Sequence, residues 1–565
     1  MKEKINNSIT KIKSIIKDFS LTEKFIFSIF SIIASFSLLF ILVGLNNKSL
    51  VSIPENGGTI VEGVIGTPRF INPVIANSNV DKDISSLIYS GLVKVESNGN
   101  VVPDLADRYE VSDDGLVYDF YLDEEAVFHD KEIVTSDDVI YTILKIQDPE
   151  IRSPRILEWE GVATEKVSDR QIRFVLETPS PNFIKNTNVG ILPKHIWQET
   201  PNDAFSLNLY NIEPIGSGPY KLDKIRRDDI SIPITYTLSV NKKYLLDKPL
   251  VDRFIFKFYK NETELIEAVE KGEVTSVSSL SPESLNEIGN ENFQIVTSSL
   301  PRVFGIFINQ IESPSLSLKS AREALRLATP KSKIVEEIFD GYADKISSPI
   351  TGLSELDFSQ DLESAEQILI EAGWDKNEQG IYTVEVEDET FILSTSISTS
   401  NVPELIDVAE TVAKEWRKIG ADVSVKVFEI SDLNQNVIRP RNFETLLFGT
   451  VVNSPADLYS FWHSSRRNDP GLNITSYTNI DTDDILEELR NTTEEDVSEE
   501  QINNLVSEIR EDIPAIFLYT PQFTYLVSDK IKGVEIENIK VASDRFKNIN
   551  KWFINTDKVW KIFNN

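Results

Sequence analysis

The residues that could carry out catalysis in this chain do not form a recognisable catalytic pattern. The three histidines, His129, His195 and His463, lie far apart in the sequence and share no spacing typical of metal ligands. The chain has 90 acidic residues, so no pair of carboxylates stands out as a general acid and base. Scattered histidines are more often turn or core residues. The sequence therefore predicts a protein that is not an enzyme and has no metal site and no cofactor.

Two glycine-containing segments resemble catalytic loops, but each lacks an essential residue. Gly58 to Gly63 begins like a phosphate-binding loop, but Val64 stands where the lysine is required. Gly216-Ser217-Gly218 is too short for the nucleophile turn of a hydrolase, and the sequence places no base near it. Cysteine is absent, which excludes disulfides, thiolate metal sites, a cysteine nucleophile and a lipid-modified cysteine.

Length and composition predict a large folded protein. The 565 residues are 41% hydrophobic and include 30 Phe, 16 Tyr and 7 Trp, enough for a sizeable core. At roughly 150 residues per domain, three to four domains or subdomains are expected. The net charge of −33 has the wrong sign for contact with a phosphate backbone, so nucleic-acid binding is excluded.

The N-terminus predicts a membrane anchor. No residue between Lys24 and Lys48 is charged, and about 20 apolar residues in a helix cross a bilayer. The lysine-rich segment 1–24 places the N-terminus in the cytoplasm by the positive-inside rule, with the anchor at 25–47 and the rest outside. The alternative is a cleaved signal peptide, but Leu42 to Asn47 offers no convincing cleavage site. A short polar tether is expected at 48–57.

Strand and helix patterns alternate through the rest of the chain, which predicts a mixed α/β fold. Gly and Pro mark several of the expected helix ends, for example Pro403 at a first helical position and Gly420 after the last turn. Strands are expected at 171–177, 253–259 and 423–427, and helices at 263–272 (with Thr263 as the cap), 319–329, 332–339, 361–372 and 403–419.

An ordered set of short motifs then identifies a family. In the first half these are Gly57-Gly58-Thr59, Thr67 to Pro73, Leu87 to Leu92, Val102 to Ala106, Val111 to Gly115, Phe128-His129-Asp130, Asp137-Asp138-Val139, Pro214 to Tyr220 and Asn241 to Pro249. In the second half they are Phe307-Ile308-Asn309, Ala321 to Leu325, Gly341 to Pro349, Ala372-Gly373-Trp374, Phe461 to Ser465 and Asn473 to Tyr477. Over roughly residues 55–545 the chain resembles the family 5 extracellular solute-binding proteins, the oligopeptide, dipeptide and nickel receptors of ABC importers.

The chain departs from the family at three places. Asp123-Glu124-Glu125 replaces a basic patch, and Lys131 replaces the glycine of a His-Asp-Gly turn. The predicted transmembrane segment replaces the lipid-modified cysteine. The first two changes are expected at the surface, and the third alters how the receptor is held rather than what it binds.

The resemblance implies a two-lobed clamshell of the periplasmic-binding-protein type, α/β with mixed sheets, that encloses its ligand by hinge closure. Lobe one is expected at 48–300, with a subdomain at about 92–191, and lobe two at 301–519. Residues 520–565 return to lobe one. The two crossings are expected near Val296 to Phe304 and Ala515 to Tyr525, both rich in strand-forming residues.

The resemblance also implies where a ligand binds. In relatives, an aspartate for the ligand amine lies in the loop that corresponds to Gly449 to Asp457. Asp457 keeps a charge there, whereas Asn453 can accept a hydrogen bond but supplies no charge, so amine recognition depends on Asp457. Trp462 is a candidate pocket wall, and Ser78 and Asn79 are the candidates from lobe one. The structural alternatives are a loop or cap acid for Asp457 and a core position for Trp462.

The function implied is a monomeric, membrane-anchored receptor that captures oligopeptides outside the cytoplasm and delivers them to an ABC permease. A peptide suits this fold because its backbone can pair as an added strand. Two alternatives stay open: a surface sensor or interaction protein that keeps the fold without transport, and a receptor for an oligosaccharide or a metal chelate.

Overall fold

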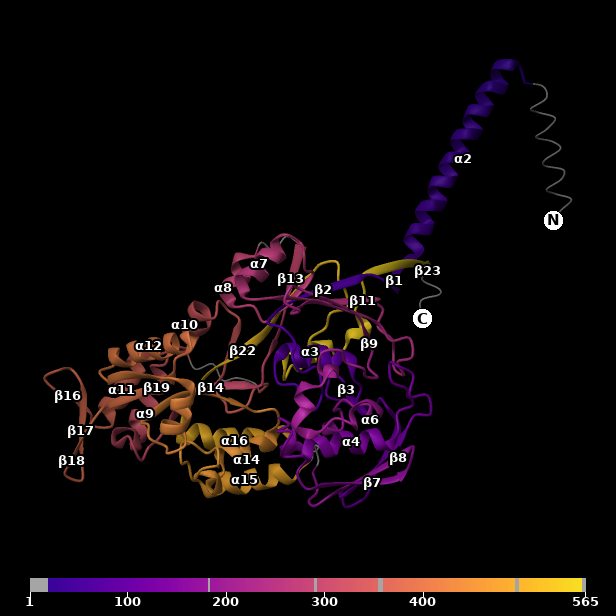
Figure 1. The fold of residues 1–565 in the computed structure, drawn as a ribbon. Coiled ribbons are helices and arrows are strands. Elements are labelled where there is room, and N and C mark those ends of the chain that lie inside the picture. Colours follow the sequence, from indigo (N-terminus) through magenta and orange to yellow (C-terminus); the bar gives the residue numbers. More distant parts are fainter. Residues whose placement is uncertain (1–18, 181–182, 289–291, 354–358, 493–496, 561–565) are drawn as a thin grey trace. The chain divides into compact units, whose positions relative to one another are not determined.

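The computed structural model describes residues 19–180, 183–288, 292–353, 359–492 and 497–560. The chain divides into two compact units, one formed by residues 1–57 with 553–565 and the other by residues 58–552 (Figure 1). Each unit is described by itself.

The first unit contains the apolar helix α2 (Leu21–Ser49) and a two-stranded ribbon. By length and composition α2 can cross a membrane, with a 20-residue segment, Leu21–Phe40, of mean hydropathy 1.7. The ribbon pairs β1 (Leu50–Glu55) with β23 (Asn555–Trp560) in antiparallel register. The segment expected to be a tether is therefore largely a strand, because the C-terminal end of the chain supplies its hydrogen-bonding partner.

The second unit is built around one mixed sheet of twelve strands. Ten of them follow one another in the order β20 (Asp422–Phe428), β19 (Ser394–Ser400), β21 (Thr445–Val451), β14 (Arg302–Ile308), β22 (Ala515–Ser528), β12 (Ser276–Ser278), β2 (Thr59–Ile65), β11 (Arg253–Tyr259), β10 (Pro233–Val240) and β9 (Tyr220–Arg227). Two more, β13 (Phe293–Ser299) and β15 (Ala343–Lys345), also pair with β22.

Strand β22 pairs with strands from both of the predicted lobes. Its first part pairs with β14 in lobe two, and its second part pairs with β13 and β12 in lobe one. The expected outgoing crossing lies on β13, β14 and the turn between them, and the expected return lies on β22. Strands β14 and β22 are largely buried, whereas β13 contains no fully buried residue. The lobe boundaries at 300 and 519 stay predictions.

A separate antiparallel sheet forms within residues 92–191, where a subdomain was expected. Its strands are β5 (Ala106–Val111), β6 (Val117–Leu122), β8 (Gln171–Leu176) and β7 (Val162–Ser168), in that order, and α4 (Ser136–Gln147) packs on it. Burial alternates along β6 and β8, so one face of each strand is covered. Phe183 packs edge to face against both Trp159 and Phe174 there, and Trp159 and Phe174 contact each other at a tilt.

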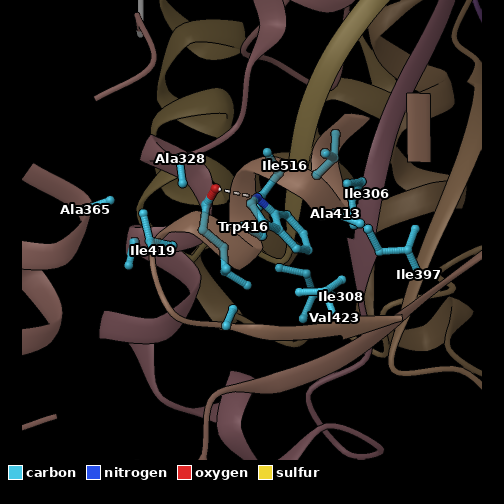
Figure 2. Close-up of a cluster of buried hydrophobic side chains, with 14 of the residues drawn as sticks. Ile306, Ile308, Ala328, Ala365, Ile397, Ala413, Trp416, Ile419, Val423 and Ile516 are labelled. Atoms are coloured by element: carbon cyan, nitrogen blue, oxygen red, sulfur yellow. Dashed lines mark hydrogen bonds between the residues drawn. The ribbon is translucent and has the colours of Figure 1, made fainter. Parts of the chain in front are cut away.

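The core of lobe two gathers around Trp416 on α12 (Pro403–Lys418) (Figure 2). The indole is fully buried, and its Nε1 donates to the Leu325 carbonyl oxygen at 2.9 Å and to the Thr329 hydroxyl at 3.1 Å. Both acceptors lie at the end of α9 (Lys319–Leu327), so one side chain fixes two helices and the sheet together.

Helix ends follow the sequence signals with one exception. Pro403 begins α12, and Gly420, with a φ of +82°, follows its end. The helix α7 (Glu262–Glu270) is capped by Asn261 and not by Thr263. The Asn261 side chain accepts from the Glu264 amide at 2.9 Å, so the helix starts one residue before the expected cap.

Candidate ligand-binding site

The lobe-one segment predicted to contact a ligand forms the start of α3 (Asn79–Ile88). Ser78 is the helix cap: its Oγ accepts from the Asp81 amide at 3.1 Å and donates to the Asp81 carboxylate at 2.6 Å. Asp81 is buried and also accepts from the amides of Arg69 and Phe70. The buried Asp81 carboxylate therefore holds this turn in place, while Ser78 and Asn79 remain exposed.

A buried charge cluster fixes α3 in lobe one. Arg545, fully buried, donates to Asp83 of α3 at 2.7 Å and to Glu62 of β2 at 2.9 Å. Tyr525 donates to Glu62 at 2.8 Å. Burial raises the pKa of both Glu62 and Asp83, and the guanidinium opposes that rise. No sequence pattern indicates this cluster, because its members are separated by up to 483 positions.

The lobe-two loop predicted to contact a ligand follows β21. The Asp457 carboxylate accepts, through Oδ2, from the backbone amides of Asn453 at 2.8 Å and Ser454 at 3.0 Å. This makes Asp457 the capping acid of a single turn, η8 (Pro455–Asp457). Its Oδ1 accepts no hydrogen bond from another described residue, and the side chain is half-buried. A cap role and a ligand contact are thus compatible.

The two segments are linked through the C-terminal part of lobe one. Lys540 Nζ donates to the Asn453 carbonyl oxygen at 3.2 Å. Two residues later begins η10 (Ala542–Phe546), which carries Arg545 and packs on α3. The predicted loop of lobe two is therefore tied to the same short segment that holds α3.

Trp462 lies in the core of lobe two at the end of α14 (Leu458–Trp462). Only 3% of it is exposed, and the indole stacks on Phe307 with the rings 6.1 Å apart. Tyr477 and Phe517 contact it edge to face. The Trp462 side chain packs in the core just after the loop of Asp457. Its contact with a ligand stays a prediction.

His129 contacts the Gly216-Ser217-Gly218 segment, which lies far from it in the sequence. Its Nδ1 accepts from the Gly216 amide at 3.3 Å, which leaves Nε2 to donate to the Gly218 carbonyl oxygen at 3.2 Å. Burial lowers the pKa of His129 to about 4, so the ring is neutral at physiological pH. His195 lies 2.8 Å from Asp130 and His463 2.8 Å from Ser465. Within the described part of the chain, no three His, Asp or Glu side chains are grouped to hold a metal ion.

Comparison with known proteins agrees with this architecture. The sequence profile of the bacterial extracellular solute-binding proteins, family 5 (middle region), matches residues 100–470. Oligopeptide-binding protein AppA of Bacillus subtilis (strain 168) is 27% identical over 521 residues, which cover 90% of this chain and 93% of AppA.

Solved structures confirm the predicted fold class. The structure of the oligopeptide-binding protein AppA from Bacillus subtilis in complex with a nonapeptide superposes with a TM-score of 0.63 at 25% identity, covering 89% of this chain and all of that one. HbpA2 from Haemophilus parasuis gives a TM-score of 0.73 at 20% identity, with 89% and 100% coverage. Both have the two-lobed fold of periplasmic binding proteins.

Proposed function

The chain belongs to the bacterial extracellular solute-binding proteins of family 5, and from this premise we propose that it captures oligopeptides and delivers them to an ABC importer. The family is one of solute-binding proteins. The observation that carries the peptide assignment is the similarity to oligopeptide-binding AppA along nearly the whole of both chains. This similarity does not favour the alternatives of a sensor without transport or of another solute.

We propose further that the receptor stays attached to the cytoplasmic membrane through α2 as a monomer, with its N-terminus in the cytoplasm. The length and hydropathy of α2 and the lysine-rich segment before it support this orientation. The binding unit then lies outside the cytoplasm, where peptides are captured before import.

The proposed contacts come from both lobes. Asp457 offers its free Oδ1 to the amino group of the peptide, and Asn453 accepts a hydrogen bond beside it. From lobe one, the exposed side chains of Ser78 and Asn79 contact the peptide backbone at the start of α3. A carboxylate that is already held by two backbone amides is preorganised, so little entropy is lost when the amine binds.

Calorimetric titration of the detergent-solubilised full chain with tri- to nonapeptides tests these contacts. Asp457→Asn removes the charge and is expected to weaken peptide binding about tenfold, the value of one charge-assisted hydrogen bond. The matched control is Asp361→Asn, because Asp361 also caps a helix, accepting from the Ser364 amide at 2.9 Å, but in a different part of lobe two. Equal affinity for the two variants would remove Asp457 from the site while leaving the peptide assignment intact.

A further inference from the structure

Lobe two contains a cavity of about 280 Å³ at the edge of its sheet. The wall is formed by β19, β20, the short helical segment η7 (Leu433–Ile438) and the residues just before β21. Its lining is polar, with aromatic side chains on two sides, and consists of Glu312, Ser398, Lys426, Phe428, Asn436, Val437, Asn442, Phe443 and Glu444.

Strand register explains why polar groups converge here. Ser398 of β19 pairs with Lys426 of β20 on one side and with Leu446 of β21 on the other. Paired residues of parallel strands point to the same face of a sheet, so Ser398 and Lys426 share the cavity face. Ser396, two residues earlier on β19, also lies on that face, and its backbone amide donates to Glu444 Oε2 at 2.6 Å.

One buried hydroxyl group on this face, that of Ser396, lacks a hydrogen-bond partner among the described residues. Ser398 lines the cavity and is 2% exposed, and the Ser396 hydroxyl is buried with no hydrogen-bond partner among the described residues. An unpaired buried hydroxyl costs about 1–3 kcal/mol, so such groups usually serve a ligand or water. The opposite face of the sheet is covered by the apolar core around Trp416, and on this face a second apolar cluster, which includes Leu446, Val437 and Phe443, borders the cavity.

The charges around the cavity are of opposite sign and on opposite sides. Lys426 lies on the edge strand β20, and neither it nor Glu312 forms an ion pair with another described residue. Glu444 lies two strands away from Lys426, about 10 Å at the usual strand spacing. Lys426 and the two glutamates therefore give the cavity groups that can bind a carboxylate and an ammonium group of one ligand.

This cavity is separate from the proposed peptide site. Glu444 directly precedes β21, whereas Asn453 follows it, and a seven-residue strand spans about 23 Å. We propose that the cavity is a second binding site, specific for a small zwitterion of the free amino acid class. Ser398 and the aromatic side chains of Phe428 and Phe443 complete the lining of the site. The inference does not depend on peptide binding in the cleft.

Saturation-transfer NMR with L-alanine as the probe tests this proposal on the detergent-solubilised full chain. Lactate and isopropylamine serve as matched probes, because each carries only one of the two charges. Alanine is expected to show saturation transfer, and the two single-charge probes at least tenfold less at equal concentration. Equal saturation transfer to alanine, lactate and isopropylamine would overturn the zwitterion site. So would the absence of saturation transfer to alanine at roughly 10 mM, a concentration at which even weak solute binding is detected.

Variants locate the binding. Lys426→Gln and Glu312→Gln are each expected to weaken alanine binding about tenfold, since each removes one charge-assisted contact. Lys414→Gln is the control: Lys414 is an exposed lysine on α12, which packs on the other face of the same sheet. Both cavity side chains are at the surface, so the variants should fold, which their thermal unfolding checks. Alanine binding that persists unchanged in both cavity variants would place it elsewhere and refute the proposal.

Discussion

Replacement of Arg545 by methionine tests how the buried charge cluster holds lobe one. The guanidinium contacts Asp83 at 2.7 Å and Glu62 at 2.9 Å, and all three side chains are at most 2% exposed. Arg545→Met leaves two carboxylates buried without their cation, which costs about 3–5 kcal/mol of unfolding free energy. A lobe of roughly 250 residues loses about 0.5 kcal/mol per degree near its midpoint, so its melting temperature should fall by about 6–10 °C.

The pH dependence separates this cause from a simple packing defect. Burial raises the pKa of Glu62 and Asp83, and the loss of Arg545 raises both further. The carboxyl groups of the variant can then take up protons as pH falls. The difference in unfolding free energy between the variant and wild type should therefore be smaller at pH 5 than at pH 8. Differential scanning calorimetry at both pH values measures this. A deficit below about 1 kcal/mol at pH 8, or one that does not change with pH, would refute the reasoning.

Three further predictions concern single side chains, each measured by thermal unfolding. The pKa of His129 is about 4 in the folded state and near 6.5 unfolded, so stability should fall by on the order of 3 kcal/mol as pH drops from about 6.5 to 4, and His129→Gln should abolish that slope. Burial raises the pKa of Asp104 to about 7, so its contribution to stability declines as pH rises from about 4 to 7; Asp104→Asn should stabilise the protein at pH 8 and not at pH 4. Trp416→Ala should cost about 3–5 kcal/mol, whereas Leu207→Ala, at an exposed leucine, should stay within about 0.5 kcal/mol of wild type.

Elements with local signals were predictable. The strand expected at 253–259 is β11 with the same ends. The helix that carries Trp416, α12, begins at Pro403 and ends just before Gly420, as these two residues predict. These signals are local because a cap, a turn glycine or an alternating apolar pattern acts within a few residues. The choice between Asn261 and Thr263 as a cap is the exception, since both residue types can accept the same hydrogen bond.

Contacts between distant segments were not predictable. The pairing of β1 with β23 joins residues 50–55 to 555–560, and nothing in either segment specifies the other. The loop of Asp457 was expected from the family resemblance, but its tie to Lys540 depends on how the return segment packs. The cavity of lobe two could not be found either, because it requires the register of β19 with its two neighbours. A serine-rich strand alone gives no sign of which hydroxyl groups are buried.

Native mass spectrometry of the detergent-solubilised full chain shows whether this protein is a peptide receptor. Purified protein should carry peptides, or should take up added oligopeptides as a single bound equivalent that dissociates at higher collision energy. The amino-acid composition of the released ligand identifies it. A chain that carries an oligosaccharide or a metal chelate, and takes up no peptide after that ligand is removed, would contradict the account.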